Sequence, residues 1–440
     1  MKNSKTKKIA VTVAAVIGAA AVLVLAFFAG YVVRDAVSGD AADWVLSIIE
    51  KYYYQDIDSS EADNIAADAI VDKYLDIYSE YYTAEEYRAL QASNGGSSSG
   101  VGISYAYIPG TGVTVIGTTG NSPSFRAGLR SGDVILYAEK EGERTYFNSS
   151  SDFSAFISEL DAGEDATYFT ASGETFTFAK EAYSVSYVLL ATNDGAWTFT
   201  FDDENNMSMV ESEGDEIDYL PDGCAYIYLS QFYGKAVEQF EMAAAKMNEL
   251  GCTSLILDLR NDGGGYVSVM QGISGCFEAS AGQLAMEARS GNGSVVEYMA
   301  GTADEESILS ADTEVYVLAN GNTASASEAL IGVLISYGIA GYEDIYVSEY
   351  SEEYLSAFGV TAESVKSGRT YGKGIMQSTY KNPLTQDALK LTTHQIYWPD
   401  GHTIHDVGLS ANDGCHTVDA PAPLSGDGEE LRLAVQAIFG

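Results

Sequence analysis

The sequence predicts a multidomain α/β protein with an N-terminal transmembrane helix. Three observations support this fold class: an uncharged apolar segment at residues 9–33, a glycine-punctuated segment of period two after residue 98, and strands alternating with helices beyond residue 183. Strands that alternate with helices are typical of a parallel or mixed sheet covered by helices. With 440 residues, the chain is long enough for two or three domains.

The N-terminus has the composition of a membrane anchor. Residues 1–8 form a short basic tail with four lysines, and residues 9–33 contain no charged side chain. A helix of that length crosses a hydrocarbon core with some tilt. Because basic flanks stay inside, we expect a single-pass protein of the cell membrane whose remaining chain is extracytoplasmic. A cleaved signal peptide is the alternative, which the long apolar segment disfavours.

The rest of the chain is strongly acidic. The formal net charge is −40, and the part beyond residue 8 carries −44, because 19 basic residues remain there against 63 acidic ones. Such a surface repels phosphate backbones, so we expect no binding to nucleic acid. Its simplest interpretation is a solubility surface on an exported protein.

Residues 40–93 are predicted to be helical. Apolar and polar side chains recur there at helical spacing, and neither Gly nor Pro interrupts residues 41–93. The sequence NGGSSSG at residues 94–100 is typical of a boundary between domains. Residues 98–182 follow with short apolar runs of period two between glycines, which indicates a β-rich domain.

Residues 183–440 are predicted to form a mixed α/β domain. Helical spacing that ends at a glycine indicates a helix at residues 238–251. Acidic insertions are expected near residues 193–220, as a hairpin, and near residues 342–368. Apolar runs indicate strands at residues 224–232, 254–260 and 314–320.

The sequence TASASEAL at residues 323–330 places three hydroxyl groups before an apolar helical pattern. Ser325 and Glu328 have the spacing of a capping box, so a plain helix cap is one interpretation. A nucleophile is the other, because backbone N–H groups at the start of a helix stabilise an oxyanion. All four histidines lie at residues 394–416, so no histidine base lies nearby in the sequence.

A lysine is the candidate base. Lys373 lies between two glycines in YGKGIMQ, and Gln377 follows four residues later. A lysine acts as a general base only when its amine is neutral, which burial favours. The side-chain carbonyl of Gln377 is placed to hold the amine in line. The alternative is an ordinary surface lysine in a turn.

Neither the histidines nor the cysteines predict a metal site. His402 and His405 have H-x-x-H spacing, with His394 and His416 nearby, but this pattern is weak without H-E-x-x-H. The cysteines are too widely spaced for a metal cluster, and disulfides and buried free thiols both stay open. They are Cys224, Cys252, Cys276 and Cys415. We therefore expect no metal and no other cofactor.

Four motifs, in order, resemble those of the carboxyl-terminal processing (tail-specific) proteases of the S41 serine peptidase family. They are LILDLRNDGGG, TASASEALIGVLISYG, YGKGIMQ and the segment from LKLTT to HDVGL. The resemblance extends from residue 40 to residue 412 and implies a mixed α/β peptidase core of the ClpP/crotonase-like type over residues 183–440.

The resemblance also implies roles for single residues. Ser325 is the implied nucleophile, Lys373 the general base and Gln377 the residue that orients the lysine. The backbone N–H groups of Ala326 and Gly264 are the implied oxyanion donors. The assignment of Gly264 is softer, because the family usually has proline at the preceding position, and a glycine there makes the turn more flexible.

Residues 98–182 resemble a PDZ domain. Gly100, Val101, Gly102 and Ile103 match the loop that receives a peptide carboxylate, and SPSFRAGLRSGDVIL matches the family's helix, turn and strand. Small residues in such a loop expose backbone N–H groups to the carboxylate, and the peptide adds to the sheet as a strand.

These resemblances imply a membrane-anchored extracytoplasmic serine endopeptidase that captures protein or peptide substrates through their C-termini. A non-catalytic PDZ scaffold on a peptidase fold is the alternative, and the presence of Ser325, Lys373 and Gln377 favours the enzyme. A metal-dependent hydrolase that uses the late histidines is a weaker third hypothesis. The oligomeric state, including a homo-oligomer, stays open.

Overall fold

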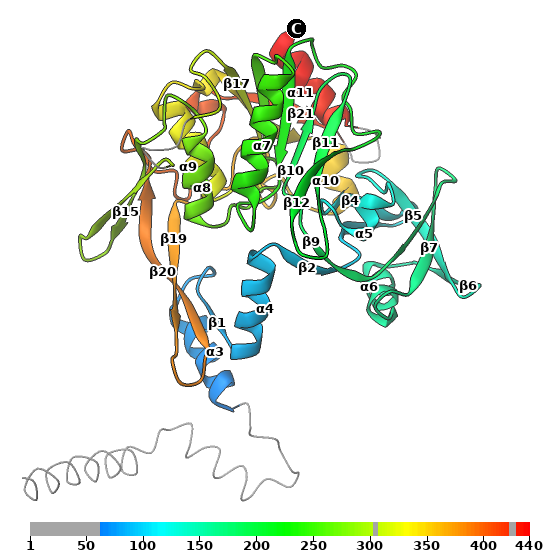
Figure 1. Ribbon diagram of the computed structural model, residues 1–440. Coiled ribbons are helices and arrows are strands. Elements are labelled where there is room, and N and C mark those ends of the chain that lie inside the picture. The colour runs from blue at the N-terminus through cyan, green and yellow to red at the C-terminus, as the bar shows by residue number, and fades with distance from the viewer. Residues whose placement is uncertain (1–61, 302–306, 422–427) are drawn as a thin grey trace, which may run out of the picture. The chain divides into compact units, whose positions relative to one another are not determined.

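The computed structural model describes residues 62–301, 307–421 and 428–440 (Figure 1). The anchor predicted at residues 9–33 therefore lies outside the described residues. Among the residues that are described, no helix has the length and apolar character needed to cross a membrane.

The chain divides into two compact units, residues 1–81 and residues 82–440. The described part of the predicted helical segment contains α3 (Ala62–Tyr74), β1 (Glu80–Tyr82) and α4 (Ala84–Asn94). The segment is therefore not helical throughout. Asp76 interrupts it, because its carboxylate accepts the backbone N–H of Ser79 at 2.9 Å and so competes with helical hydrogen bonding.

A β-rich domain occupies the first part of the second unit. Its antiparallel sheet has the order β3 (Ile103–Ile108), β4 (Gly112–Thr118), β5 (Val134–Lys140), β7 (Asp165–Thr170) and β8 (Thr175–Ala179), with β6 (Glu143–Tyr146) paired to β5. The helices are α5 (Pro123–Arg126) and α6 (Ser150–Glu159). Alternate residues of the strands point into its core. Leu129, after α5, and Phe153, in α6, are fully buried there. Strands β2 (Ser97–Gly100) and β9 (Glu181–Ser184) pair and join the two ends of the domain.

An eight-stranded sheet forms the centre of the second domain. Its order is β12 (Met207–Glu211), β11 (Ala196–Phe201), β10 (Val188–Ala191), β13 (Cys224–Leu229), β14 (Ser254–Asp258), β17 (Glu314–Ala319), β18 (Ile345–Tyr350) and β21 (His416–Ala420). The five strands from β13 to β21 are parallel, whereas β10, β11 and β12 are antiparallel. The predicted acidic hairpin is β11 and β12, at the edge of this sheet.

Helices cover both faces of the central sheet (Figure 1). One face packs against α7 (Ala236–Glu249), α8 (Val267–Gly275) and α9 (Ala326–Ser336), and the other against α11 (Glu429–Phe439). Successive residues of β14 show why: Leu255 and Leu257 enter the first core and Ile256 enters the second. Side chains of a strand alternate between faces, so a strand buried on both faces is apolar throughout.

A separate antiparallel sheet carries the segment that follows Lys373. It contains β16 (Val295–Met299), β15 (Leu284–Ser290), β20 (Ala388–Tyr397) and β19 (Ile375–Lys381), in that order. The remaining elements are α10 (Glu352–Phe358) and two short 3₁₀ helices, η1 (Tyr342–Asp344) and η2 (Ala411–Asp413).

The predicted insertion at residues 342–368 needs a correction. Residues 345–350 form β18, a buried strand of the central sheet that pairs with β17 and β21. Ile345 and Val347 are fully buried there, so the burial of this apolar run, and not its acidic surroundings, decides its place. The rest of the predicted insertion, residues 342–344 and 351–368, lies outside the central sheet.

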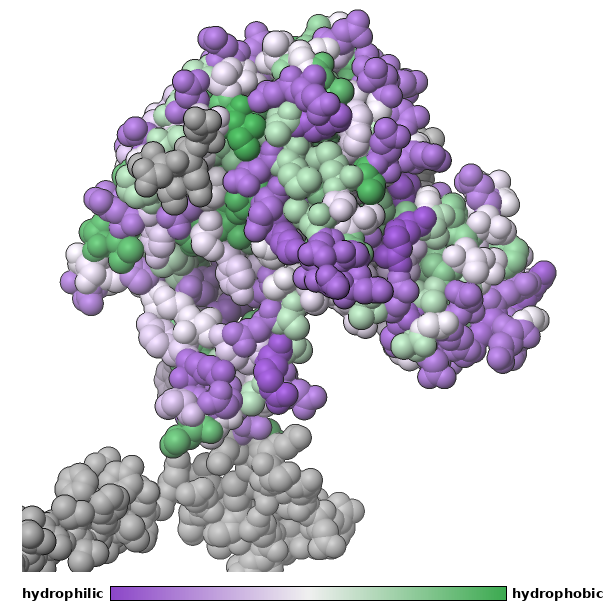
Figure 2. Space-filling view, in the orientation of Figure 1, coloured by the Kyte–Doolittle hydropathy of each residue, from purple (hydrophilic) through white to green (hydrophobic). Residues whose placement is uncertain are grey.

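Hydrophilic side chains cover much of the face seen in Figure 2, and apolar residues are scattered among them. Scattered apolar side chains are normal on a soluble domain and mark no site by themselves.

Candidate active site

Ser325 lies at the end of the loop that connects β17 to α9. It is the residue before the first turn of α9, and its backbone has φ 61° and ψ −115°. A positive φ is uncommon for a residue with a side chain, and backbone strain of this kind gathers at functional sites. Ser325 therefore combines the predicted helix cap with a strained backbone.

The neighbouring hydroxyl groups have structural partners. Thr323 Oγ1 donates to the carbonyl of Leu259 at 2.8 Å, and Ser327 Oγ donates to the carbonyl of Asp262 at 2.9 Å. Both bonds fasten the loop after β17 to the loop after β14. The hydroxyl groups on either side of Ser325 are thus held by the fold.

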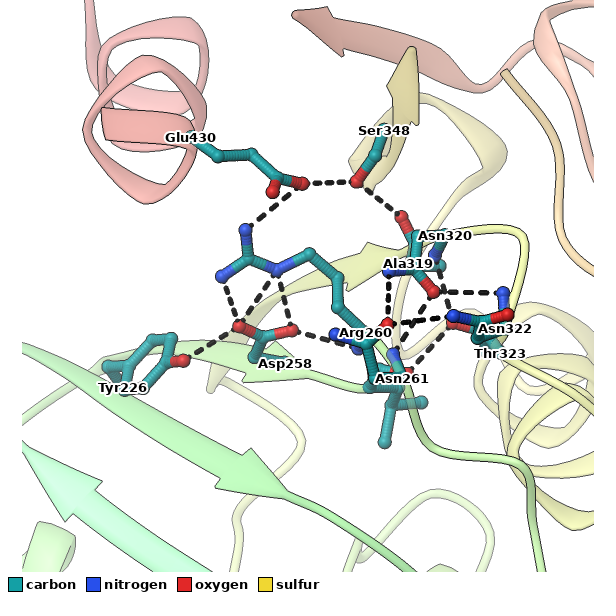
Figure 3. A network of polar contacts seen from close by, with 11 residues as sticks. Tyr226, Asp258, Arg260, Asn261, Ala319, Asn320, Asn322, Thr323, Ser348 and Glu430 are labelled. Atoms are coloured by element: carbon teal, nitrogen blue, oxygen red, sulfur yellow. Dashed lines mark hydrogen bonds and ion pairs between the residues drawn. The ribbon is translucent and has the colours of Figure 1, made fainter. Parts of the chain in front are cut away.

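Polar side chains brace the same two loops (Figure 3). The Asn320 side chain accepts the backbone N–H of Asn261 and donates to the Asn261 side chain, both at 3.0 Å. Beside them, the Arg260 guanidinium lies 2.5 Å from the Asp258 carboxylate and 3.1 Å from the carboxylate of Glu430 on α11. This network joins the end of β14 to the C-terminal helix.

The glycine turn after β14 lies against the serine. Gly264 has φ 90°, and a Cβ at this position would be 3.0 Å from the Cβ of Ser325 and 2.7 Å from the backbone nitrogen of Ala326. Ala326 is the first residue of α9, so its N–H has no acceptor within the helix. The two backbones implied as oxyanion donors therefore lie next to each other and to Ser325.

The Gly264 N–H already has a partner in this structure. It donates to Asp262 Oδ1 at 2.8 Å, so it must leave that carboxylate before it binds an oxyanion. Asp262 is fully buried, and its Oδ2 has no hydrogen-bond partner among the described residues. Burial raises the pKa of this carboxyl well above its usual range. No sequence pattern predicted that Asp262 accepts the Gly264 N–H.

A buried carboxylate connects the serine segment to the lysine segment. Glu328 accepts the backbone N–H of Ser325 at 3.0 Å and that of Lys373 at 2.9 Å. It also accepts the Gly372 N–H at 2.8 Å and the Thr370 hydroxyl at 2.6 Å. The S-x-x-E spacing predicted the bond to Ser325, but no sequence signal predicted the three bonds to the other segment.

Gln377 lies on β19, just after the lysine. Its Nε2 donates to Thr392 Oγ1 of β20 at 3.0 Å, which restrains the amide and leaves its oxygen as the acceptor of the group. Gly374 packs on the backbone of His405, where a Cβ would lie 2.8 Å from the His405 nitrogen. The chain that follows Lys373 is therefore tightly held.

Of the loop at residues 100–103, Val101, Gly102 and Ile103 line a groove of about 320 Å³ between β3 and α6. The carbonyl oxygens of Val101 and Gly102 accept backbone N–H groups from residues 119–124, at 3.2 and 2.9 Å. Because the peptide units are trans and planar, the N–H groups of Gly102 and Ile103 point away from these donors. The loop is therefore held by its carbonyl side.

The described residues contain no cluster of three or more His, Cys, Asp or Glu side chains that would hold a metal ion. His402 is exposed and pairs with Asp400 at 3.1 Å. All four cysteines are free thiols, and three of them are buried.

Known proteins resemble this chain in sequence and in fold. Residues 223–341 match the sequence model of peptidase family S41. A probable CtpA-like serine protease of Staphylococcus aureus (strain N315) is 23% identical over 381 residues, which cover 86% of this chain and 64% of that protein. One from Staphylococcus epidermidis is 23% identical over 368 residues, covering 83% of this chain and 63% of that protein. The chain thus spans less than two thirds of the length of these relatives.

Solved structures add the fold. A putative S41 protease from Bacteroides fragilis superposes with a TM-score of 0.54 at 13% identity, over 90% of this chain and 96% of that one. The photosystem II D1 C-terminal processing protease is 21% identical over 83% of this chain and 84% of that one, with a TM-score of 0.45. The first likeness supports a shared multidomain α/β fold.

Proposed function

Because residues 223–341 match the sequence model of peptidase family S41, we propose that the chain is a membrane-anchored extracytoplasmic serine endopeptidase with Ser325 as nucleophile and Lys373 as general base. The observation that carries the proposal is the Glu328 carboxylate, which accepts backbone N–H groups of both Ser325 and Lys373. Two motifs that lie 48 residues apart in the sequence (373 minus 325) share one buried anchor.

The proposed reaction proceeds in two steps. Ser325 Oγ attacks the substrate carbonyl while the Lys373 amine takes its proton, and the lysine then gives that proton to the leaving amine. Water then attacks the acyl-enzyme while Lys373 takes its proton, and the lysine returns that proton to Ser325 Oγ as the acyl–oxygen bond breaks. The Ala326 N–H stabilises the oxyanion, and the Gly264 N–H joins it after leaving Asp262. Gln377 holds the lysine amine in line.

The groove beside α6 is proposed to bind the C-terminus of the substrate. Its loop directs the Gly102 and Ile103 N–H groups away from the carbonyl side that anchors it, and such groups receive a carboxylate. The edge strand β3 then offers backbone groups to an extended peptide. The net charge of −40 repels a free carboxylate at long range, so local N–H groups must supply the attraction.

The residues at 9–33 are proposed to anchor the enzyme, with residues 1–8 in the cytoplasm. Release from membranes should therefore require detergent. A mature protein recovered in the medium and starting beyond residue 33 would instead show a cleaved signal peptide.

The test uses the full chain in detergent with an unfolded protein as substrate. Ser325→Ala and Lys373→Ala should each abolish cleavage, because the two side chains act as one unit. His402→Ala, an exposed change outside the site, serves as the matched control and should keep its activity. Full activity of Lys373→Ala, with an unchanged unfolding temperature, would contradict the Ser/Lys assignment.

A peptide series separates the enzyme from the non-catalytic scaffold and tests the groove. Amidation of the substrate C-terminus should raise KM and leave kcat largely unchanged, since the groove binds and Ser325 cuts. Binding of free C-termini without any cleavage would favour the scaffold. Equal KM values for free and amidated peptides would show that the groove does not read C-termini.

A further inference from the structure

The Glu328 side chain is unusual for a helix cap. It is fully buried, and its carboxylate accepts four hydrogen bonds, two on each oxygen. A capping glutamate needs only the bond to the N–H of the cap residue, here Ser325. The other three donors belong to Thr370, Gly372 and Lys373, on the segment that leads into β19.

The hydrogen bonds also define the charge on Glu328. Thr370 Oγ1 accepts the backbone N–H of Leu409 at 2.8 Å, so its own proton points to Glu328. All four partners of the carboxylate are then donors, which fits the ionised form. Burial raises the pKa of the Glu328 carboxyl, and the four donors oppose that rise. A buried charge is costly unless it is fully hydrogen-bonded, as it is here.

We propose that Glu328 is a positioning residue that fixes the Lys373 segment against the Ser325 segment, so that amine and hydroxyl align. The inference rests on the proposed function of these two residues. Glu328 Oε2 accepts the backbone N–H groups of both Ser325 and Lys373, so a shift of either segment breaks a hydrogen bond to this one atom. The bond to Ser325 also holds the strained backbone, φ 61°, that aims its side chain.

Glu328→Gln is the first test. The variant keeps the size of the side chain but turns one acceptor into an NH₂ group, which faces N–H or O–H donors in either orientation. Misplacement of reacting groups by about 1 Å costs roughly 100-fold in rate, so we expect kcat to fall by about that factor. KM should stay unchanged, because the substrate groove lies outside these contacts. Activity is measured on the full chain in detergent.

A matched pair at Thr370 gives the second test. Thr370→Val keeps the shape and removes the hydroxyl that donates to Glu328, whereas Thr370→Ser keeps the hydroxyl. The free energy of a hydrogen bond to a charged group is equivalent to a rate factor of about 10 to 100. Thr370→Val should therefore lower kcat by about 10-fold or more, whereas Thr370→Ser should keep the wild-type kcat. A merely structural side chain would not distinguish these variants through kcat alone. This pair decides the question if Glu328→Gln fails to fold.

The outcomes separate this inference from the proposed function. If Ser325→Ala keeps wild-type cleavage, the proposed function fails whatever Glu328 does. If Ser325→Ala is inactive but a folded Glu328→Gln keeps wild-type kcat, the positioning role is refuted. A raised KM with unchanged kcat, or a Thr370→Ser variant as slow as Thr370→Val, would also refute it.

Discussion

Arg260 offers the sharpest test of how the central sheet supports the site. Its guanidinium lies 2.5 Å from the Asp258 carboxylate and 3.1 Å from that of Glu430, and the exposed fractions of the Arg260 and Asp258 side chains are 15% and 1%. The Asp258 carboxylate also accepts the Tyr226 hydroxyl at 2.7 Å and the Arg260 backbone N–H at 2.9 Å. Arg260→Met removes the guanidinium and keeps an apolar chain of similar length.

The structure sets the expected magnitude. Removing one partner of a buried ion pair destabilises a protein by roughly 3–5 kcal/mol, because the other charge stays buried without compensation. Asp258 keeps two neutral donors after the change, so we expect a loss at the low end, about 3 kcal/mol. In Arg260→Met/Asp258→Leu both charges are absent, so much of that loss should be recovered, as in other buried pairs replaced by apolar residues.

Urea unfolding followed by circular dichroism measures both values. The midpoint should fall in Arg260→Met with little change in the slope m, which would show that stability has changed and not the extent of unfolding. A loss below 1 kcal/mol in Arg260→Met would refute the reasoning. A double variant that is less stable than Arg260→Met would also refute it, because the loss of stability would then not come from the uncompensated charge of Asp258.

Two further predictions follow from single groups. Because burial raises the pKa of Asp262, wild-type stability should fall as pH rises from about 4, the carboxyl's unfolded value, through its raised folded value. Asp262→Asn removes that titration, so its stability relative to wild type in urea should improve between pH 4 and pH 8; an unchanged difference would contradict this prediction. Four thiols should react with Ellman's reagent in urea, and in the folded protein only Cys252, the half-buried one, should react. Fewer than four thiols in urea would show a disulfide.

The sequence alone determined the local features of this protein. The apolar runs of β13, β14 and β17 identify strands buried on both faces, because the alternation of strand side chains makes such runs apolar throughout. The motifs around Ser325 and Lys373 resemble those of a serine peptidase family, and the spacing of Ser325 and Glu328 predicted the bond between them. Each of these features depends on neighbours within a few residues.

Only the tertiary structure decided which segments far apart in the sequence contact each other. It put residues 345–350 into the central sheet, bound the Gly264 N–H to Asp262, and brought the Lys373 segment to the Glu328 carboxylate. A hydrogen bond between distant segments requires their backbones to meet in one register and orientation. That register follows from the packing of whole strands and helices, and no local spacing of residues encodes it.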